Sequence, residues 1–308
     1  MIKPRRIGPA TFETQDVEKQ IAYWTDVAGL VLAEREKNRA FLASKTGLLS
    51  VALERADRAH CARLSFEVSP NDDFGDLAKK LAADGIKSEL RNDAVPGMGK
   101  VLSFKDNKGT SIDLFQEWSY LGSHHHVSGI GPLKLGHIAF HVPDVKATAD
   151  FYAKVMGFRV SDWIEDWFVF MRCNPDHHTV NFIRGDNIEM HHIAFELKDM
   201  SHMVAACEMF AHKNIRILWG PLRHGPGHNI ATYHRNSDDH TVELYIDLDQ
   251  MKDEDLGYFD PRPWHRNTPQ RPMTWTRTES TIWGLPPLPD YRRGSGVPVV
   301  GEQGPVKH

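Results

Sequence analysis

Some segments of the chain have apolar residues at helical spacing, and others have apolar residues at every second position. These segments follow one another in a repeated order, which predicts a repeated order of helices and strands. A strand is predicted at 6–13, followed by a helix that Asp16 caps and Gly29 ends. The same two periods predict strands at 39–53 and 61–68, a helix at 74–83, and strands around 100–104 and 110–115. The first part of the chain therefore follows the order strand, helix, strands, and follows it twice.

The second part of the chain repeats the first about 130 positions later. Matched segments are 15–17 with 143–145, 23–24 with 151–152, 28–30 with 156–158, 65–68 with 194–197 and 112–115 with 242–245. Helices are again predicted, at 145–156 and near 199–211. A register that holds over about a hundred positions indicates a duplicated domain. We therefore predict an α+β fold of two duplicated domains, each containing two βαβββ modules.

Changes in composition divide the chain into four parts. Residues 1–120 form the first predicted domain, 121–132 a linker rich in glycine and histidine, and 133–250 the second domain. Residues 251–308 are rich in Pro, Trp and Arg without a clear period, and predict an irregular tail. Because Trp264, Trp275 and Trp283 favour burial, we expect the tail to cover the second domain or to contact a neighbouring subunit.

Three residues of the second domain form a candidate metal site. His137 and His192 each stand directly before an Ile-Ala-Phe strand core, and Glu243 lies inside a further predicted strand. Two imidazoles and one carboxylate that leave open positions make the facial triad of non-haem Fe(II) oxygenases. A single strand histidine is more often a hydrogen-bonded structural residue. Three ligand-type residues in duplicated strand contexts favour a metal site.

The repeat allows the two domains to be compared at the same three positions. Pro9 and Arg63 stand where the second domain has its two histidines, and Asp113 stands where it has the glutamate. The first domain is therefore predicted to have the fold without the metal. His141 lies four residues after His137 and shares its strand face, whereas strand alternation turns His191 away from His192. Both are interpreted as structural residues.

Two polar clusters precede the second and third candidate ligands. Residues 175–182 include His177 and His178, and residues 223–233 run from an Arg-His pair through His228 to Tyr233. Imidazoles transfer protons near neutral pH, and a tyrosine hydroxyl can hold a phenolic oxygen. At this level the same residues could equally be exposed loop side chains.

Composition excludes several classes of protein. The 308 residues are 41% hydrophobic and 25% charged, and the formal net charge is −4, which argues against nucleic acid as a partner. No apolar run approaches the roughly 18 residues that a membrane span needs. The three cysteines are far apart, which indicates a reduced, cytoplasmic protein.

Over residues 6–249 the chain resembles the type I extradiol ring-cleavage dioxygenases of the vicinal oxygen chelate superfamily, most specifically over 133–245. The resemblance implies that each domain forms an open, barrel-like mixed sheet. It implies that His137, His192 and Glu243 bind Fe(II), with Mn(II) as a second possibility. A catechol-type aromatic diol and O2 would be the substrates of an extradiol, or meta, ring cleavage in the degradation of aromatic compounds. The enzyme would be a homo-oligomer that binds neither nucleic acid nor membrane.

The resemblance also assigns roles near the metal. His178, fourteen residues before His192 in a His-His-Thr run, would be the acid–base residue. His224 and Tyr233, the latter ten residues before Glu243, would contact the substrate oxygens. The family's Asp-Pro-x-Gly turn after the tyrosine is replaced here by residues 234–240, at the same length.

Three alternatives fit parts of the pattern. A glyoxalase-like metal isomerase uses four ligands from two modules and leaves His178, His224 and Tyr233 unexplained. The hydroxyphenylpyruvate dioxygenase type has a C-terminal glycine- and phenylalanine-rich helix that this sequence lacks. A non-catalytic small-molecule binding protein usually lacks the triad. The identity of the catechol, the position of cleavage and the choice of Fe or Mn stay open at this level.

Overall fold

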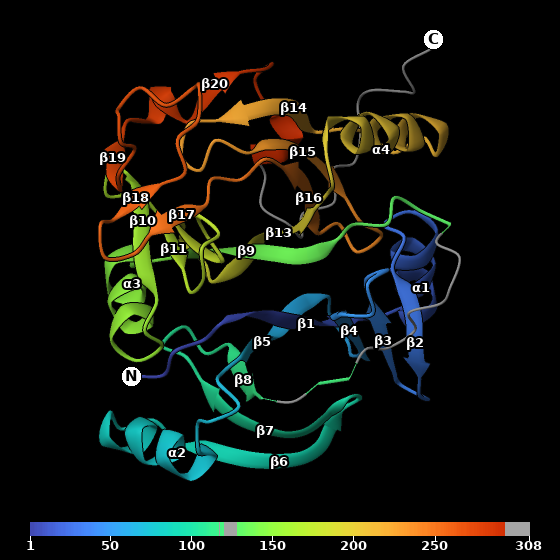
Figure 1. The fold of residues 1–308 in the computed structure, drawn as a ribbon. Helices are drawn as coiled ribbons and strands as arrows, with labels where there is room; N and C mark the ends of the chain where they lie inside the picture. Colours follow the sequence, from blue (N-terminus) through green and yellow to red (C-terminus); the bar gives the residue numbers. More distant parts are fainter. Residues whose placement is uncertain (117, 120–127, 293–308) are drawn as a thin grey trace.

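The computed structural model describes residues 1–116, 118–119 and 128–292. Residues 121–127 of the predicted linker and residues 293–308 of the predicted tail lie outside the described residues. Figure 1 shows two curled sheets, one above the other, with the helices at their flanks. The fold is therefore mixed α+β with two sheet-rich halves.

The first half forms an eight-stranded sheet in the order β2-β3-β4-β1-β5-β8-β7-β6. Its strands are β1 (Arg6–Thr14), β2 (Val31–Arg35), β3 (Arg39–Ala43), β4 (Leu49–Arg55), β5 (His60–Glu67), β6 (Ser88–Val95), β7 (Met98–Lys105) and β8 (Ser111–Phe115). Parallel pairs join β1 to β4 and β5 to β8, whereas β1 and β5 are antiparallel in the centre. Each βαβββ module thus supplies one side of the sheet.

The second half repeats this arrangement within a ten-stranded sheet, in the order β19-β10-β11-β12-β9-β13-β16-β15-β14-β20. Its repeated strands are β9 (Lys134–Val142), β10 (Arg159–Ile164), β11 (Phe168–Arg172), β12 (Val180–Arg184), β13 (Glu189–Glu196), β14 (Trp219–His224), β15 (Ile230–Arg235) and β16 (Thr241–Ile246). Without β19 and β20, this order is that of the first sheet with every strand number raised by eight. The predicted duplication and fold class are confirmed.

Each module has one helix, and each of the four begins at an aspartate. The helices are α1 (Val17–Asp26), α2 (Phe74–Ala83), α3 (Val145–Lys154) and α4 (Met200–His212). The carboxylates of Asp16, Asp73, Asp144 and Asp199 each accept a hydrogen bond from a backbone N–H in the first turn. This cap satisfies an amide that has no partner inside the helix, and it fixes where each helix begins.

The two halves pack through their central strands. In Figure 1, β1 of the first sheet and β9 of the second lie side by side where the two sheets meet, and the two strands contact each other. Trp24 of the first half is fully buried, with its ring 5.5 Å from that of Phe195 in the second half. One continuous apolar core includes residues of both halves, so the first half supports the strands that carry the candidate site.

The tail is more regular than its sequence predicts. It contains β17 (Met251–Asp253), β18 (Tyr258–Phe259), β19 (Met273–Trp275), β20 (Thr281–Trp283) and the short 3-10 helices η1 (Arg277–Glu279) and η2 (Pro289–Arg292). Strand β19 pairs with β10 and β20 pairs with β14, so the tail extends the second sheet at both ends. Trp275 is buried, whereas Trp283 is 44% exposed. The tail thus crosses over the second half, at the top of Figure 1.

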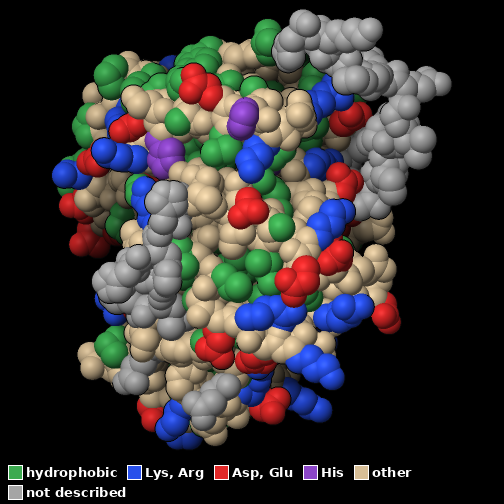
Figure 2. All heavy atoms as spheres, turned by 90° about the vertical axis from the view of Figure 1, so that its right-hand side faces the viewer, with side chains coloured by type: hydrophobic (Ala, Val, Ile, Leu, Met, Phe, Trp, Pro, Cys, Tyr) green, Lys and Arg blue, Asp and Glu red, His purple; other side chains and the backbone are tan. Residues whose placement is uncertain are grey.

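The surface matches the small net charge. Figure 2 shows Lys and Arg side chains interspersed with Asp and Glu over one face of the molecule. None of the helices in the described residues is long and apolar enough to span a membrane.

A buried cluster of His228, Asp249 and His265 joins the tail to the second half. The Nδ1 of His228 and the Nε2 of His265 lie 2.7 and 3.0 Å from the same oxygen of Asp249, at hydrogen-bonding geometry. Three ligand-type groups gather here as well, but these hydrogen bonds already account for their positions. Burial tends to raise the pKa of Asp249, and the two histidines outweigh it, so the pKa lies below its usual value.

We expect Asp249→Asn to lower the free energy of unfolding at neutral pH by about 1–3 kcal/mol, the scale of a hydrogen bond to a charged group. Because the folded-state pKa is lowered, this stabilisation is complete above the unfolded pKa of about 3.9 and is lost as the pH falls through the folded value. Denaturant titrations from pH 7 to pH 3 should therefore show the difference from the native protein shrinking. Asp255→Asn, an exposed change on the same segment, is the control. A difference that is constant with pH would contradict this account.

Candidate active site

The three candidate ligands lie on adjacent central strands of the second sheet. His137 is on β9, His192 on β13 and Glu243 on β16, and these strands are neighbours in that order. Ala194 of β13 pairs with His137 on one side and with Glu243 on the other. His192 lies two residues from Ala194 on the same strand. The sheet register therefore brings the three side chains together without any loop.

The donor atoms converge as a metal site requires. The Nε2 atoms of His137 and His192 each lie 3.1 Å from the same oxygen, Oε2 of Glu243. The three atoms all lie within 4.8 Å of one another. Two ligands at right angles, each about 2.1 Å from one ion, would be about 3 Å apart. The buried Nε2 of His192 has no hydrogen-bond partner despite its closeness to the carboxylate, so hydrogen bonding does not explain its position. The residues fit a divalent cation.

Electrostatics favour the protonation states that bind a metal. Burial would raise the pKa of Glu243, but the two neighbouring imidazoles overcome this and hold the pKa well below its usual range. Burial also lowers the pKa of His137. A carboxylate and a neutral imidazole at neutral pH are the forms that coordinate a cation.

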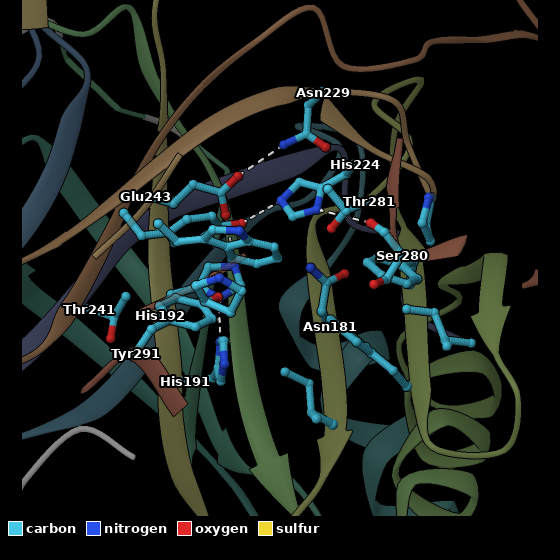
Figure 3. A pocket seen from close by; sticks show the side chains of 18 of the residues that line it. Asn181, His191, His192, His224, Asn229, Thr241, Glu243, Ser280, Thr281 and Tyr291 are labelled. Carbon is cyan, nitrogen blue, oxygen red and sulfur yellow. Dashed lines mark hydrogen bonds and ion pairs between the residues drawn. The ribbon is translucent and has the colours of Figure 1, made fainter. Parts of the chain in front are cut away.

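Neighbouring polar groups orient two of the donors. The side-chain amide of Asn229 donates to Oε1 of Glu243 at 2.9 Å, which leaves Oε2 facing the histidines. The Nδ1 atoms of His191 and His192 lie 2.6 Å apart. Figure 3 shows Asn229 and His191 reaching these donors from opposite sides. Such outer partners hold ligand side chains in place and tune their basicity.

The triad opens into a cavity of about 890 Å³. Its walls come from β9 to β16 and from the tail residues 277–291. Most of the wall is apolar or aromatic, and its apolar residues include Ile164, Trp167, Phe168, Phe170, Ile183, Trp219, Ile282, Trp283 and Leu285. A concave, largely apolar site with a few convergent polar groups is typical of small-molecule binding.

His178, His224 and Tyr233 line the same cavity. The ring of His178 lies 4.2 Å from that of His137, and the ring of Tyr233 lies 5.7 Å from that of His192, between ring centroids. The Tyr233 hydroxyl lies 2.7 Å from Nε2 of His224. All six residues predicted from the sequence are thus brought to one site.

Burial changes the proton affinity of these three groups in a consistent direction. It lowers the pKa of His178 well below the usual value, with His137 and His177 adding to the effect. It also lowers the pKa of His224. Burial, followed by the charge of Glu243, raises the pKa of Tyr233 well above the usual value. At neutral pH the site therefore holds neutral imidazoles and a protonated phenol.

Several cavity residues were missed by the sequence interpretation. His141 and His191, interpreted as structural, both line the cavity. The register of β13 shifts between Met190 and His192, so the alternation that would turn His191 away from His192 is interrupted there. Asn229 directly follows a Gly-Pro-Gly-His run, and the sequence interpretation considered the histidine of that run but not the asparagine.

The matched positions of the first half hold a salt bridge. Arg63 lies 2.7 Å from Asp113, whose carboxylate is fully buried and also accepts a hydrogen bond from Ser103. Pro9 supplies no donor. Within the described residues, neither of the two groups of metal-ligating type includes a residue of the first half.

Comparisons with known proteins agree with this fold. A model of the Glyoxalase/Bleomycin resistance protein/Dioxygenase superfamily matches residues 134–244. The 3-methylcatechol 2,3-dioxygenase of Pseudomonas putida is 27% identical over 252 residues, 74% of this chain and 85% of that enzyme. The Mn(II)-bound glyoxalase from Novosphingobium aromaticivorans has a TM-score of 0.82 at 23% identity, covering 94% of both chains. An extradiol ring-cleaving dioxygenase from B. fuscum has a TM-score of 0.81 at 23% identity, covering 96% of this chain and 83% of that one.

At these identities, the likeness to the two solved structures shows the fold and does not by itself distinguish an isomerase from a dioxygenase. Residues 134–244 thus match a domain of the Glyoxalase/Bleomycin resistance protein/Dioxygenase superfamily, and over most of its length the chain is similar to an extradiol catechol dioxygenase.

Proposed function

We propose that this protein is an extradiol dioxygenase, which inserts O2 into a catechol beside its two hydroxyl groups. One divalent cation, Fe(II) or alternatively Mn(II), is bound by His137, His192 and Glu243. The observation that carries the proposal is the convergence of these donors at the wall of a cavity that also contains His178, His224 and Tyr233. Three protein ligands leave positions on the ion for two substrate oxygens and for O2.

When bound, the cation would hold both reactants side by side and let electron density pass from the diol to oxygen. The protein supplies orientation and proton transfer. The Nδ1 of His224 lies 3.4 Å from the carbonyl of Ser280, so this nitrogen carries the proton and Nε2 accepts from the Tyr233 hydroxyl. The Tyr233 oxygen can then accept a hydrogen bond from a substrate hydroxyl in place of the one from Tyr291. Through Tyr233, His224 can take up the proton of one of the two substrate hydroxyls.

His178 faces the cavity from the other side and is the proposed acid–base residue. Its lowered pKa keeps it neutral and ready to accept a proton. A general base that is neutral at the working pH and lies within reach of the substrate accelerates a reaction by about 10²–10⁴-fold. The apolar walls keep bulk water away from the reacting groups.

The walls also indicate the kind of catechol. Among the described residues that line the cavity, Arg277 is the single Lys or Arg, and it is paired with Glu165 at 3.0 Å. The aromatic side chains Trp167, Phe168 and Phe170 offer apolar contact instead. We therefore propose that alkyl- or aryl-substituted, uncharged catechols bind better than catechols that carry a carboxylate.

The test is an anaerobic protein loaded with Fe(II) and, separately, with Mn(II), mixed with a catechol panel and then exposed to O2. We expect yellow ring-opened products, with kcat/KM at least about tenfold higher for uncharged aryl-substituted catechols than for carboxylated ones, a difference of about 1.4 kcal/mol. The absorbance of the product and O2 uptake would be measured together. Metal binding without ring opening across the whole panel would overturn the dioxygenase and favour the glyoxalase-like isomerase or the binding protein. The homo-oligomeric state and the cytoplasmic location stay predictions.

A further inference from the structure

A second buried histidine stands behind the proposed acid–base residue. His177 is 1% exposed, and it lies on the segment between β11 and β12. Its Nδ1 is 3.0 Å from Nδ1 of His178, and its Nε2 is 3.0 Å from Oδ2 of Asp162. The ring is therefore engaged at both nitrogens, one toward the cavity residue and one toward a carboxylate.

Asp162 is held in one orientation. It lies on β10, is 1% exposed, and accepts hydrogen bonds from three donors. The indole Nε1 of Trp275 donates to Oδ2 at 2.7 Å, and the backbone N–H of Met273 donates to Oδ1 at 2.8 Å. His177 donates to Oδ2 as the third. Both tail residues belong to β19, so the docked tail fixes this carboxylate.

These contacts determine which ring nitrogens carry protons. An ionised carboxylate can only accept, so Nε2 of His177 is the protonated nitrogen of that ring. In neutral His177, Nδ1 is then an acceptor. Since two acceptors cannot share a hydrogen bond, Nδ1 of His178 carries the proton that bridges the two rings. Nε2 of His178 is left without a proton and is the nitrogen available to a ligand in the cavity.

We propose that Asp162 and His177 are positioning residues that hold His178 as a base with a bare Nε2. This inference rests on the proposed function, since it assigns the protonated atoms of the proposed acid–base residue. In the first step, a substrate O–H gives its proton to Nε2 of His178, and the electron pair stays on the substrate oxygen. The resulting imidazolium keeps its Nδ1–H bond to His177, and the carboxylate of Asp162 compensates the charge through that ring. The proton is later returned from Nε2.

A purely structural role explains these contacts less well. The His177 ring is 5.8 Å from the ring of Phe170 and 5.1 Å from that of Phe259, between centroids. An apolar side chain would pack among such neighbours without a polar partner. A buried carboxylate and a buried imidazole are costly unless each of their hydrogen bonds is made. Asp249 and Asp176 are also near. The Asp249 backbone carbonyl accepts from the His177 N–H at 2.9 Å while its carboxylate is engaged by His228 and His265, and the Asp176 carboxylate is paired with Lys134.

The first test reads the protons directly and does not depend on turnover. Metal-free protein labelled with ¹⁵N-histidine would be examined by two-dimensional NMR, with the signals of His177 and His178 assigned from the His177→Phe and His178→Phe variants. We expect His177 as the Nε2–H tautomer and His178 as the less common Nδ1–H tautomer. An Nε2–H tautomer at His178 would overturn the proposal. This result stands whether or not the protein cleaves catechols, so it separates this inference from the proposed function.

The second test uses matched variants of the fully loaded enzyme. His177→Phe removes the acceptor, whereas the amide oxygen of His177→Asn can occupy the position of Nδ1 and accept from His178. We expect kcat of the Phe variant to fall roughly 10–100-fold, the scale for losing an outer partner of a site residue. The Asn variant should recover most of this loss, and KM should change little in both.

His234→Phe is the control, since His234 is a buried imidazole that contacts Tyr23 and Phe210 outside the cavity. It should keep the native kcat. Equal losses in the Phe and Asn variants, or a loss confined to KM, would mean that His177 acts through packing alone. Metal content and anaerobic catechol binding, measured on each variant, would show that the site itself is intact.

Discussion

His192→Ala is expected to lose the metal and ring cleavage together. The Nε2 of His192 is one of three donors within 4.8 Å of one another, and removing the imidazole leaves two of the three. The metal affinity should fall by at least about 100-fold, the upper end of the loss from removing an outer partner alone. Turnover should fall below detection at metal concentrations that saturate the native protein.

Two measurements separate this outcome from general damage. Metal content after dialysis reports binding directly. The melting temperature with and without Mn(II) reports it by linkage, because a ligand that binds the folded state stabilises it by RT ln(1 + [L]/Kd). The native protein and His234→Phe should both show the rise, and His192→Ala should not. A His192→Ala protein that binds metal as tightly as the native one would place the cation elsewhere.

His178→Phe is expected to behave differently, keeping the metal and losing the chemistry. His178 contacts the His137 ring but provides none of the three converging donors. We expect bound Fe(II) and anaerobic catechol chelation to be retained, with turnover at least about 10²-fold lower, the scale of general acid–base catalysis. The phenyl ring fills the same space, so packing is preserved.

The measurement is single-turnover kinetics, in which anaerobic enzyme–catechol complex is mixed with O2. This arrangement removes substrate binding from the observed rate. A His178→Phe protein with nearly native turnover on its best catechol would move the proton to another residue. His228 is already engaged by Asp249, so His224 would then be the next candidate.

The sequence predicted the repeated part of the fold well, because each half carries the same amphipathic periods. Helix α2 has the predicted bounds, and the central strands differ from prediction by a few residues. Strands β2 and β6 were missed. Both lie at an end of the first sheet, where polar residues such as those of Ser88–Val95 weaken the alternation. An outer strand forms because the neighbouring strand offers backbone N–H and C=O groups for hydrogen bonding. The local sequence pattern of the outer strand says little about whether such a neighbour exists.

The candidate metal ligands could be predicted because the repeat allows the two halves of the sequence to be compared position by position. His137, His192 and Glu243 stood out because the matched positions of the first half lack such residues. Asp162 and its contacts with Met273 and Trp275 were not predicted, since they join residues more than a hundred positions apart. No local pattern reports a pairing of that kind. The register shift before His192 was hidden for a similar reason, because it depends on how β13 meets β9.

The pairing of β19 with β10 and of β20 with β14 has a consequence for association. An unpaired outer strand presents a row of free backbone N–H and C=O groups to which a strand from another molecule can add. In the second sheet both such rows are at least partly occupied by the chain's own last strands. In the first sheet β2 and β6 end the row, with Leu32 and Leu90 exposed on them. A chain that stopped after Asp249 would end the second sheet at β10 and β14, of six residues each, in place of β19 and β20, of three residues each. Because short outer strands resist strand addition, the loss of the tail would favour self-aggregation through the half that carries the candidate site.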